Sequence, residues 1–556
     1  MTAGNMSNLA TPSMATGRLS PWVLIATIGT IVTMSLSFKL VWSMLRYLKV
    51  MQWRQWRLGR QMRAQGHTGP SFGVFRSNLK EMKELTMNSP KDPLYKNGEL
   101  SHDLMPLVYP ALNTWKNRYG DKFIFTNDTT SRITMYSDDA QAVKEIFAGN
   151  FLQYEKPKLS NSPELFGSNG LVFSEHEEWA RQRKIVRPAF YPGRCKKIVE
   201  EMATWIELWL QKLENSAVHK EGSDSFEIEM YAAIDDLTKD ILARSSFGSS
   251  FEKGKKGFNH QVKHMYLLYR QQMIPNPLLR WIGGPSALQR AIRNEKEELL
   301  KCLREIIQER RKSIEPGNVE SYGGDLLGVL LADRDQRLAE KGRPPGEFET
   351  EDEHLTDQCR TFFLAGAETI HSALGWSTVL MAHYIDWQER IRAEVQEVFG
   401  DTPPNGDKLV KLKQLDMFVH ECLRLYTPAP TTYREVVEPN TTVQGEVLPK
   451  YLAIMISFLG VHHSKEYWGE DALQFKPERF ANGILEACKQ QYAFYPFGFG
   501  PRTCVAQAMA VTEVKLVMAM LVQRFSFQLS PSYQHEPGLR VVLYPKFGIP
   551  IIMKRI

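Results

Sequence analysis

The chain has 556 residues, of which 43% are hydrophobic and 24% are charged, and its formal net charge is +6. The whole basic excess lies before residue 64, so the rest of the chain has no net positive charge and nucleic-acid binding is not expected. The 6 cysteines lie far apart, without C-x-x-C or histidine-rich spacing, and indicate neither a zinc site nor a disulfide framework.

The N-terminus predicts a membrane anchor. Residues 19–38 hold no charged side chain and are long enough to cross a bilayer as one helix. A cleaved signal peptide is the alternative, but its apolar region would be shorter and would end in a small-residue cleavage site. Only Arg18 precedes the stretch, whereas basic residues without an acidic one follow it, at Lys39, Arg46, Lys49, Arg54, Arg57, Arg60 and Arg63. The positive-inside rule therefore predicts a lumenal tail at 1–18, a transmembrane anchor at 19–38 and a cytosolic remainder.

After the anchor we expect a basic juxtamembrane linker at 39–66 and one large folded domain at 67–556. Trp42, Trp53 and Trp56 lie among the basic residues of the linker and are expected near lipid headgroups. Within the domain, helical patterns and short β-like runs predict a mainly α fold with smaller β-sheets. Helices are expected at 287–312 and 387–399. Strands are expected at 122–125, 132–136, 451–457 and 547–552. Residues 317–350 are rich in Gly, Pro and charge, which predicts a surface excursion.

A long apolar segment from about 355 to 385 predicts a helix that is buried through the core. Within it, Gly366 weakens the helix, and the hydroxyl of Thr369 can bond to the carbonyl of Ala365 and open a groove that holds water. Glu368 beside this groove would supply protons. The alternative is an ordinary core helix with a back-bonded threonine and a glutamate that reaches solvent.

Two charged side chains further on are spaced for an ion pair. Glu421 and Arg424 lie three residues apart on one face of a predicted helix. Such pairs are most often solvated surface contacts, so the spacing alone is a weak signal.

The most informative stretch is the loop from Phe497 to Cys504, which delivers one cysteine to the start of an apolar helix. Unpaired backbone N–H groups and the helix dipole favour an anionic sulfur there, which would lower the pKa of the Cys504 thiol and make it a metal ligand. Gly498 and Gly500 permit a loop that curls beneath a flat macrocycle. The sequence therefore predicts the thiolate ligand of a haem, whereas an isolated cysteine before a helix would be an inert buried thiol.

With these residues the chain resembles the cytochrome P450 superfamily, whose ligand motif runs Phe-x-x-Gly-x-Arg-x-Cys-x-Gly. Residues 497–506 depart from it only at Ala506, and the Ala365-Gly366-x-Glu368-Thr369 order resembles the oxygen-activation motif, with Ile370 as a departure. Residues 179–183 resemble the family's Trp-x-x-x-Arg helix. Residues 475–480 resemble the segment that supplies a second arginine to the Glu-x-x-Arg pair. The resemblance covers roughly residues 67–556 and implies the P450 fold.

The resemblance also implies roles for residues. Cys504 would ligate the iron of haem b in the loop that begins at Phe497, with Trp179, Arg183, Arg434 and Arg502 at the propionates and His463 near the haem edge. Glu421, Arg424 and Arg479 would form a structural network. Glu368 and Thr369 would deliver protons, and Ala365 and Gly366 would leave room for dioxygen.

The implied reaction inserts one oxygen atom from O2 into a small hydrophobic substrate. Electrons would come from NADPH through a membrane-bound diflavin reductase, because the chain has no nicotinamide fingerprint, and the basic run 181–197 would suit an acidic face on that partner. Residues 247–251, 468–472 and 500–507 resemble a plant endoplasmic-reticulum group that hydroxylates isoprenoid hormones, triterpenoids and fatty acids. The loops at 159–171 and 265–282 would carry substrate selectivity.

Two other functions remain open at this point. A haem-thiolate isomerase or lyase of hydroperoxides needs neither reductase nor proton relay, and Glu368 and Thr369 argue against it. A non-catalytic membrane haem protein would not need these residues either. Dependence on NADPH and a reductase separates the monooxygenase from the isomerase, and ligand-induced displacement of a water from iron separates either enzyme from a non-catalytic haem protein.

Overall fold

The computed structural model describes residues 27, 29–35, 37–39, 41–42, 53–73, 77–89, 94–96, 98–127, 132–157, 169–216, 225–248, 251–272, 286–315, 318–340, 350–490 and 492–556. Most of the predicted anchor at 19–38 lies outside these residues, as do large parts of the two predicted selectivity loops. In the part of the chain that the structure describes, no helix is both long enough and apolar enough to cross a membrane.

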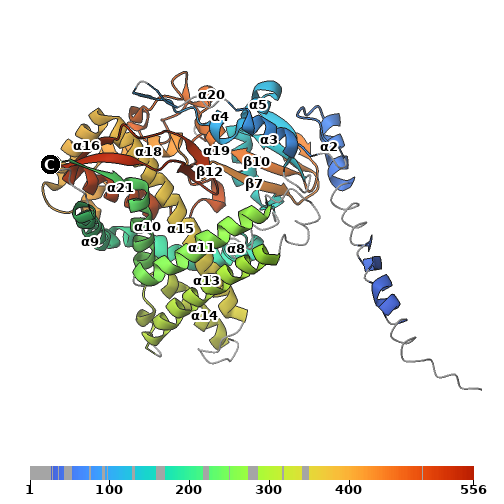
Figure 1. Ribbon diagram of the computed structural model, residues 1–556, viewed down its shortest axis with the longest axis horizontal. Helices are drawn as coiled ribbons and strands as arrows, with labels where there is room; N and C mark the ends of the chain where they lie inside the picture. The colour runs from blue at the N-terminus through green and yellow to red at the C-terminus, as the bar shows by residue number, and fades with distance from the viewer. Residues whose placement is uncertain are drawn as a thin grey trace, which may run out of the picture.

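Helices dominate the fold (Figure 1). The longer α-helices are α2 (Arg54–Ala64), α3 (Leu79–Met87), α5 (Pro110–Tyr119), α8 (His176–Val186), α9 (Pro192–Ser216), α10 (Met230–Phe247), α11 (Phe251–Gln272), α13 (Ser286–Lys312), α14 (Leu326–Glu340), α15 (Thr350–His383), α16 (Ile385–Phe399), α18 (Lys413–Leu425) and α21 (Gln507–Arg524). Shorter turns are α4 (Met105–Val108), α6 (Ala140–Lys144), η2 (Glu145–Gly149), η3 (Phe151–Gln153), η4 (Arg187–Phe190), η5 (Val319–Tyr322), α17 (Gly406–Leu409), α19 (Phe458–His462), α20 (Lys465–Trp468), η6 (Pro477–Phe480) and η7 (Gly500–Arg502).

The strands form a five-stranded sheet, a three-stranded sheet and hairpins. The larger sheet has the order β3 (Lys122–Asn127), β4 (Arg132–Ser137), β10 (Ala453–Ser457), β7 (Thr431–Val436), β5 (Tyr154–Glu155), with only β4 and β10 parallel. The smaller sheet has the order β11 (Phe525–Leu529), β14 (Pro550–Arg555), β6 (Ser225–Glu229) and is antiparallel. The hairpins pair β1 (Tyr95–Lys96) with β2 (Glu99–Leu100), β8 (Thr441–Val443) with β9 (Glu446–Leu448), and β12 (Pro537–Leu539) with β13 (Leu543–Pro545).

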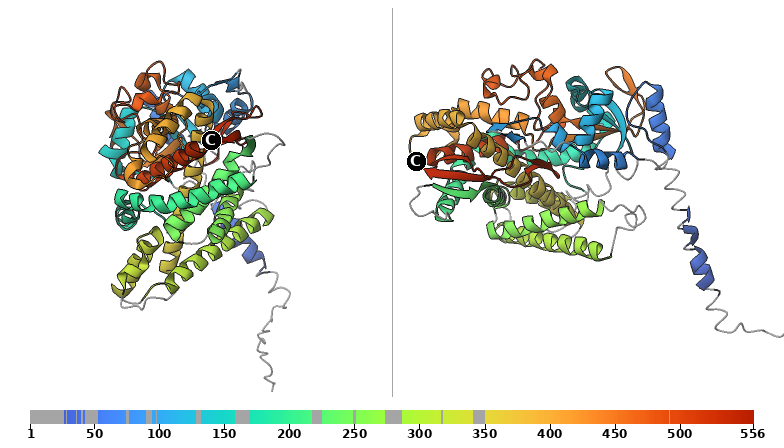
Figure 2. Two further views of the ribbon diagram at one scale, coloured as in Figure 1. Left: turned by 90° about the vertical axis from the view of Figure 1, so that its left-hand side faces the viewer. Right: turned by 45° about the horizontal axis from the view of Figure 1, so that its top comes forward.

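The long helix α15 is the centre of the helical part. The main cluster of buried side chains lies where α15 meets α9, α16, α18 and α21, and a second cluster joins it to α10, α13 and α14. Two further views show α11 and α13 side by side below this core, with the larger sheet on the side toward α2 (Figure 2). The predicted mainly α fold with smaller sheets is therefore confirmed.

Several predicted boundaries hold and others are wrong. The helices expected at 287–312 and 387–399 exist as α13 and α16, and the buried helix expected at 355–385 is α15. The final strand begins at Pro550 instead of 547, because Gly548 has φ +72° and turns the chain there. The strand expected from 451 begins at Ala453, because Tyr451 also has a positive φ, +73°.

Two longer segments differ from their predicted form. Residues 317–350 were expected to be a surface excursion, yet they contain α14, whose leucines Leu326, Leu327, Leu330, Leu331 and Leu338 are buried at helical spacing between charged residues. Residues 39–66 were expected to be a linker, yet 54–64 form α2, which packs on β4 through Leu58, Gly59 and Met62. In both segments the apolar stripe of an amphipathic helix was hidden by the many charges on its other face.

Candidate active site

The loop that carries Cys504 is closed by backbone contacts. The N–H of Cys504 donates to the carbonyl of Phe497 over 2.9 Å, and Phe497 is packed against the main core cluster. Gly498 and Gly500 have φ +76° and +71°, in the left-handed region that favours glycine. A β-carbon on Gly500 would lie 2.1 Å from the carbonyl oxygen of Phe147, so this glycine is also required by a close backbone contact.

The helix predicted after Cys504 begins at Gln507, with Ala506 as its N-cap residue. Ala506 has φ −101° and ψ 17°, a conformation that does not need glycine, so the structure accommodates the departure from the family motif without backbone strain.

Cys504 is an exposed residue, although protein atoms surround its thiol. In these surroundings burial raises the pKa of the thiol, while the N–H of Ala506 and the charge of Arg183 act in the opposite direction. The prediction that this position alone lowers the thiol pKa is therefore wrong for the protein by itself, because desolvation outweighs the helix terminus. A bound metal cation would favour the thiolate.

Basic side chains gather around the ligand loop. Arg502 donates to the carbonyl of Ser174 over 2.7 Å, pairs with Glu175 and lies over the ring of Trp179 at 4.8 Å. Arg434 is 5% exposed and lies over the Phe147 ring at 4.3 Å.

The charges in this cluster do not balance. Burial, followed by the charge of Arg502, lowers the pKa of Arg434 to about 10, and Glu175 only partly offsets this. Burial and both of these arginines also lower the pKa of Lys156 well below its usual value. Among the described residues, Arg434 forms no ion pair with a carboxylate, whereas Arg502 has Glu175. A buried excess of cations is costly unless an anion joins it.

These observations fit a haem. Its two carboxylates would balance the cations of the cluster, which supplies planar guanidinium donors for bidentate contacts. Its iron would take a thiolate such as that of Cys504, an exposed free cysteine. The residues present therefore match the donor set that the group needs.

The helix α15 contains the predicted hydroxyl contact. Thr369 Oγ1 donates to the carbonyl of Ala365 over 2.6 Å, which takes up an acceptor that the helix would otherwise use. A β-carbon on Gly366 would meet the side chain of Leu242 in α10 at 2.8 Å. The small size of Gly366 therefore permits close packing of α10 on α15. Ile370 is buried in the main core cluster.

Glu368 faces a polar cluster between α15 and α10. Burial raises the pKa of its carboxyl, and the neighbouring charge of Asp235 adds to this. Asp235 of α10 pairs with Lys239 over 2.6 Å. It also lies 3.6 Å from His371, which follows Glu368 by one turn of α15. A carboxyl with a raised pKa holds its proton more readily near neutral pH, as a proton donor must.

The three predicted members of the structural network lie together. Arg424 binds Glu421 through two bonds of 2.7 and 2.8 Å, and both side chains are 0% exposed. Arg479 Nε lies 3.5 Å from the same carboxylate, and its Nη1 lies 2.8 Å from Asp471. The carbonyls of His462, Ala472 and Gln474 accept the remaining protons of Arg424.

Comparisons with known proteins agree on one family. The Cytochrome P450 family model matches residues 106–549. The chain is a cytochrome P450. It is 32% identical to Cytochrome P450 CYP72A616 of Paris polyphylla over 93% of this chain and 96% of that enzyme. It is 33% identical to Cytokinin hydroxylase of Arabidopsis thaliana and to 11-oxo-beta-amyrin 30-oxidase of Glycyrrhiza uralensis, in each case over 90% of this chain and 93% of the relative.

A solved structure shows the same fold. Retinoic acid bound cyanobacterial CYP120A1 superimposes with a TM-score of 0.67 over 79% of this chain and 93% of that chain, at 23% sequence identity. Membership of the family makes this chain a P450 monooxygenase and implies a haem with a cysteine thiolate ligand.

One predicted haem contact of this P450 has another partner. His463 Nε2 lies 2.9 Å from the carbonyl of Leu425, at the end of α18. The side chain is 8% exposed, and burial lowers its pKa to about 3. This bond gives His463 a structural partner, and its position near the haem edge stays a prediction. The neighbouring His462 likewise bonds Thr427 and the N–H of Tyr495.

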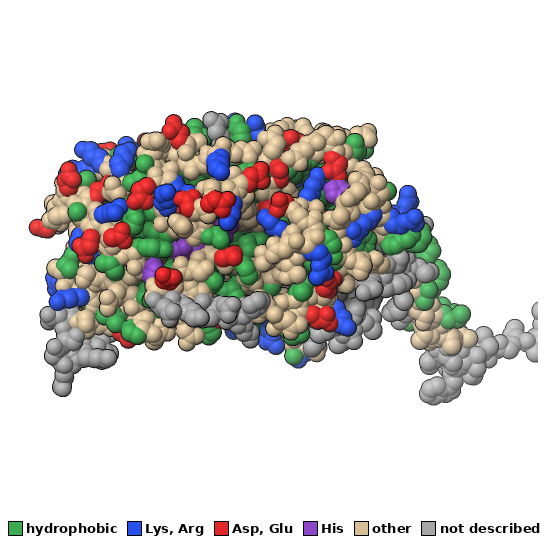
Figure 3. All heavy atoms as spheres, turned by 90° about the horizontal axis from the view of Figure 1, so that it is seen from above, with side chains coloured by type: hydrophobic (Ala, Val, Ile, Leu, Met, Phe, Trp, Pro, Cys, Tyr) green, Lys and Arg blue, Asp and Glu red, His purple; other side chains and the backbone are tan. Residues whose placement is uncertain are grey.

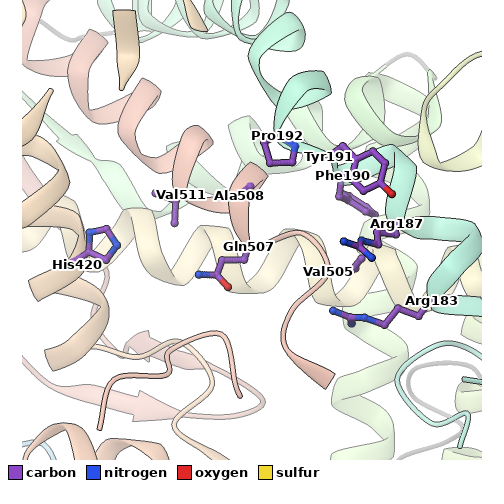
Figure 4. Close-up of a pocket in the computed structure, with 10 residues that line it drawn as sticks. All are labelled: Arg183, Arg187, Phe190, Tyr191, Pro192, His420, Val505, Gln507, Ala508 and Val511. Atoms are coloured by element: carbon purple, nitrogen blue, oxygen red, sulfur yellow. The ribbon is translucent and has the colours of Figure 1, made fainter. Parts of the chain in front are cut away.

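Beside Val505, the residue that follows Cys504, the P450 has an open groove of about 460 Å³ (Figure 4). Arg183 and Arg187 lie at one end and His420 at the other, with Gln507 and Ala508 of α21 between them. Lys184, Arg187, Lys196 and Lys197 of the predicted basic run are exposed. Arg181 is different, because it pairs with Glu178 over 2.7 Å and lies 3.5 Å from Asp333.

Sequence reasoning missed Lys156, Glu175, Asp235 and Lys239. Each becomes part of the site through a contact with a distant segment, and none belongs to a recognisable motif. The spacing of Asp235 and Lys239, four residues apart, was the one available signal, and it is typical of many surface pairs.

Proposed function

We propose that this P450 inserts one oxygen atom from O2 into a small hydrophobic substrate of the isoprenoid, steroid, hormone or fatty-acid type. The observation that supports this best is the pairing of an accessible Cys504 thiol with an unbalanced cation cluster around Arg434 and Arg502. The haem that these residues would hold supplies oxygen activation. The substrate class rests on the relatives named for cytokinin hydroxylation and for oxidation of 11-oxo-beta-amyrin.

We assign proton delivery to Glu368 and Thr369. The Glu368 carboxyl, with its raised pKa, would hold a proton, and the Thr369 hydroxyl, which bonds the Ala365 carbonyl, would pass it on. Oxygen activation consumes protons, whereas rearrangement of a hydroperoxide needs no external proton or electron. This pair therefore favours a monooxygenase over the isomerase or lyase and over a non-catalytic haem protein.

We place electron entry at the groove beneath Cys504. The partner would be an NADPH-dependent diflavin reductase with an acidic face, because Arg183 and Arg187 line the groove and the same basic run of the chain has exposed lysines at 184, 196 and 197. Rim charges mainly affect the rate of association, so the rate of electron transfer should fall as ionic strength rises.

We place the enzyme in the endoplasmic-reticulum membrane, with residues 19–38 as a single anchor, 1–18 in the lumen and the catalytic domain at 67–556 in the cytosol. The support is the uncharged stretch followed by basic residues without an acidic one. Alkaline extraction of membranes would test this, because a single-pass anchor stays with the lipid and a peripheral protein is released.

The first test of the enzyme is the difference spectrum of the reduced, carbon-monoxide-bound protein. Thiolate ligation gives the characteristic red-shifted Soret band, and Cys504→Ser should abolish it. Cys359→Ser, which removes a buried thiol from α15, is the matched control and should keep the band. A normal thiolate band in Cys504→Ser would overturn the assignment.

A further inference from the structure

A second groove lies beside the helix that follows the predicted anchor. It has a volume of about 600 Å³ and is lined by residues of α2, of the turn that follows α2, and of α3 and α5: Trp56, Arg60, Arg63, Gly69, Pro70, Ser71, Phe72, Glu81, Arg118 and Tyr119. Neither the haem site nor the groove beneath Cys504 includes any of these residues. The groove therefore needs an explanation of its own.

The helix α2 is fixed in place by its inner face. Gln55 Oε1 accepts from the N–H of Ile133 over 2.8 Å, and a β-carbon on Gly59 would meet the Phe72 ring at 2.2 Å. Arg63 donates to the carbonyls of Gly69 and Pro70 over 2.9 and 2.8 Å, which closes the turn after the helix. The groove is thus a formed feature between α2, the turn that follows it, α3 and α5.

Its lining is basic and aromatic. Arg60 and Arg118 are exposed, and Arg60 lies over the Trp56 ring at 4.9 Å. Among the described residues neither arginine forms an ion pair, and the lining carboxylate, Glu81, accepts from the indole of Trp115 over 3.1 Å. The groove therefore carries a net positive charge that is available to a ligand.

Aromatic side chains extend this surface toward the anchor. Trp53 is 51% exposed and its ring lies 4.9 Å from that of Trp56. Seen from above, hydrophobic and basic side chains lie next to one another where the N-terminal segment leaves the body (Figure 3). Indole rings beside arginines suit the boundary between lipid headgroups and acyl chains.

We propose that this groove binds the headgroup of an anionic glycerophospholipid from the membrane that holds residues 19–38. The phosphate would lie between Arg60 and Arg118, and the glycerol and first acyl carbons would lie on Trp53 and Trp56. The proposal rests on the proposed membrane anchor, which would bring the groove to the membrane surface. Its function would be to fix the orientation of the catalytic domain on the membrane.

The test is native mass spectrometry of the full-length holoprotein in nonionic detergent with equal amounts of phosphatidylglycerol and phosphatidylcholine. We expect a preference of about thirtyfold for phosphatidylglycerol, since each arginine near an anionic lipid contributes about a factor of five. The double variant Arg60→Gln with Arg118→Gln should lose it. Arg57→Gln removes an exposed arginine of α2 that does not line the groove, and this control variant should keep the preference for phosphatidylglycerol.

Three results would overturn the proposal. Equal loss in Arg57→Gln would mean a diffuse electrostatic attraction, and an unchanged preference in the double variant would mean that lipid binds elsewhere. Full displacement of the lipid by inorganic phosphate would mean a site for free anions. The spectrum of the carbon-monoxide complex reports on Cys504, and alkaline extraction reports on the anchor, so failure of either earlier proposal is distinguishable from failure of this one.

Discussion

The sharpest prediction concerns His463, for which a structural role and a role at the haem edge give different results. Its pKa of about 3 in the folded protein lies below the usual value of 6.5, because burial disfavours the charged imidazole. The free energy of unfolding is therefore unaffected by His463 above pH 6.5 and falls as the pH drops from 6.5 toward 3, because the unfolded chain then binds a proton that the folded protein does not.

When the pH falls from about 7.5 to about 5.5, this histidine should lower the free energy of unfolding by about 1.4 kcal/mol. Nearly all of the loss comes below pH 6.5, where the unfolded chain binds one proton more than the folded protein. His463→Gln keeps an N–H for the Leu425 carbonyl and removes the titration, so over this range the variant should lose about 1.4 kcal/mol less stability than the parent. The measurement is urea denaturation followed by tryptophan fluorescence at both pH values. Parallel losses in parent and variant would refute the reasoning. A shifted Soret band in the variant would restore His463 to the haem edge.

Other variants test the remaining site residues. Thr369→Ala should still bind substrate but should release more peroxide per NADPH consumed, because the relay beside the Ala365 carbonyl is lost; a peroxide assay measures this. Glu421→Gln should cost about 3–5 kcal/mol and reduce haem incorporation, measured by the haem-to-protein absorbance ratio, because it leaves buried arginine charge without a partner. Arg434→Met should stabilise the haem-free protein in thermal melts and speed haem loss from the holoprotein. Gly500→Ala should lower the melting temperature more than Gly498→Ala, because both have positive φ but only Gly500 meets a backbone carbonyl.

The local parts of the site could be predicted from the sequence. The bond from Thr369 to Ala365 spans one helical turn, and the Cys504 loop is closed within eight residues by the Phe497 carbonyl, so neighbours along the chain determine both. The pairing of Glu421 with Arg424 follows from helix geometry in the same way. Their burial did not follow from spacing, because it depends on the segment that ends in Arg479.

Other features depend on distant contacts and could not be predicted. The packing of Gly366 against Leu242, for example, joins residues more than a hundred positions apart in the chain. The pairing of Glu175 with Arg502 spans 327 positions. The helix α14 was missed for a different reason, because its leucines alternate with charged residues that dominate the composition of the segment.

The cation cluster links cofactor binding to folding. Arg434 and Lys156 each have a pKa that burial and the charge of Arg502 hold below the usual value, and Glu175 offsets this only in part. Charges held in this way reduce the stability of the protein without its cofactor, since each would be better solvated in the unfolded chain. With two propionates beside them, the same cations would stabilise the folded protein instead of destabilising it. A ligand that binds only the folded state stabilises that state further. Arg434 should therefore lower the stability of the haem-free protein and raise the stability of the holoprotein, so that folding is favoured when the haem is bound.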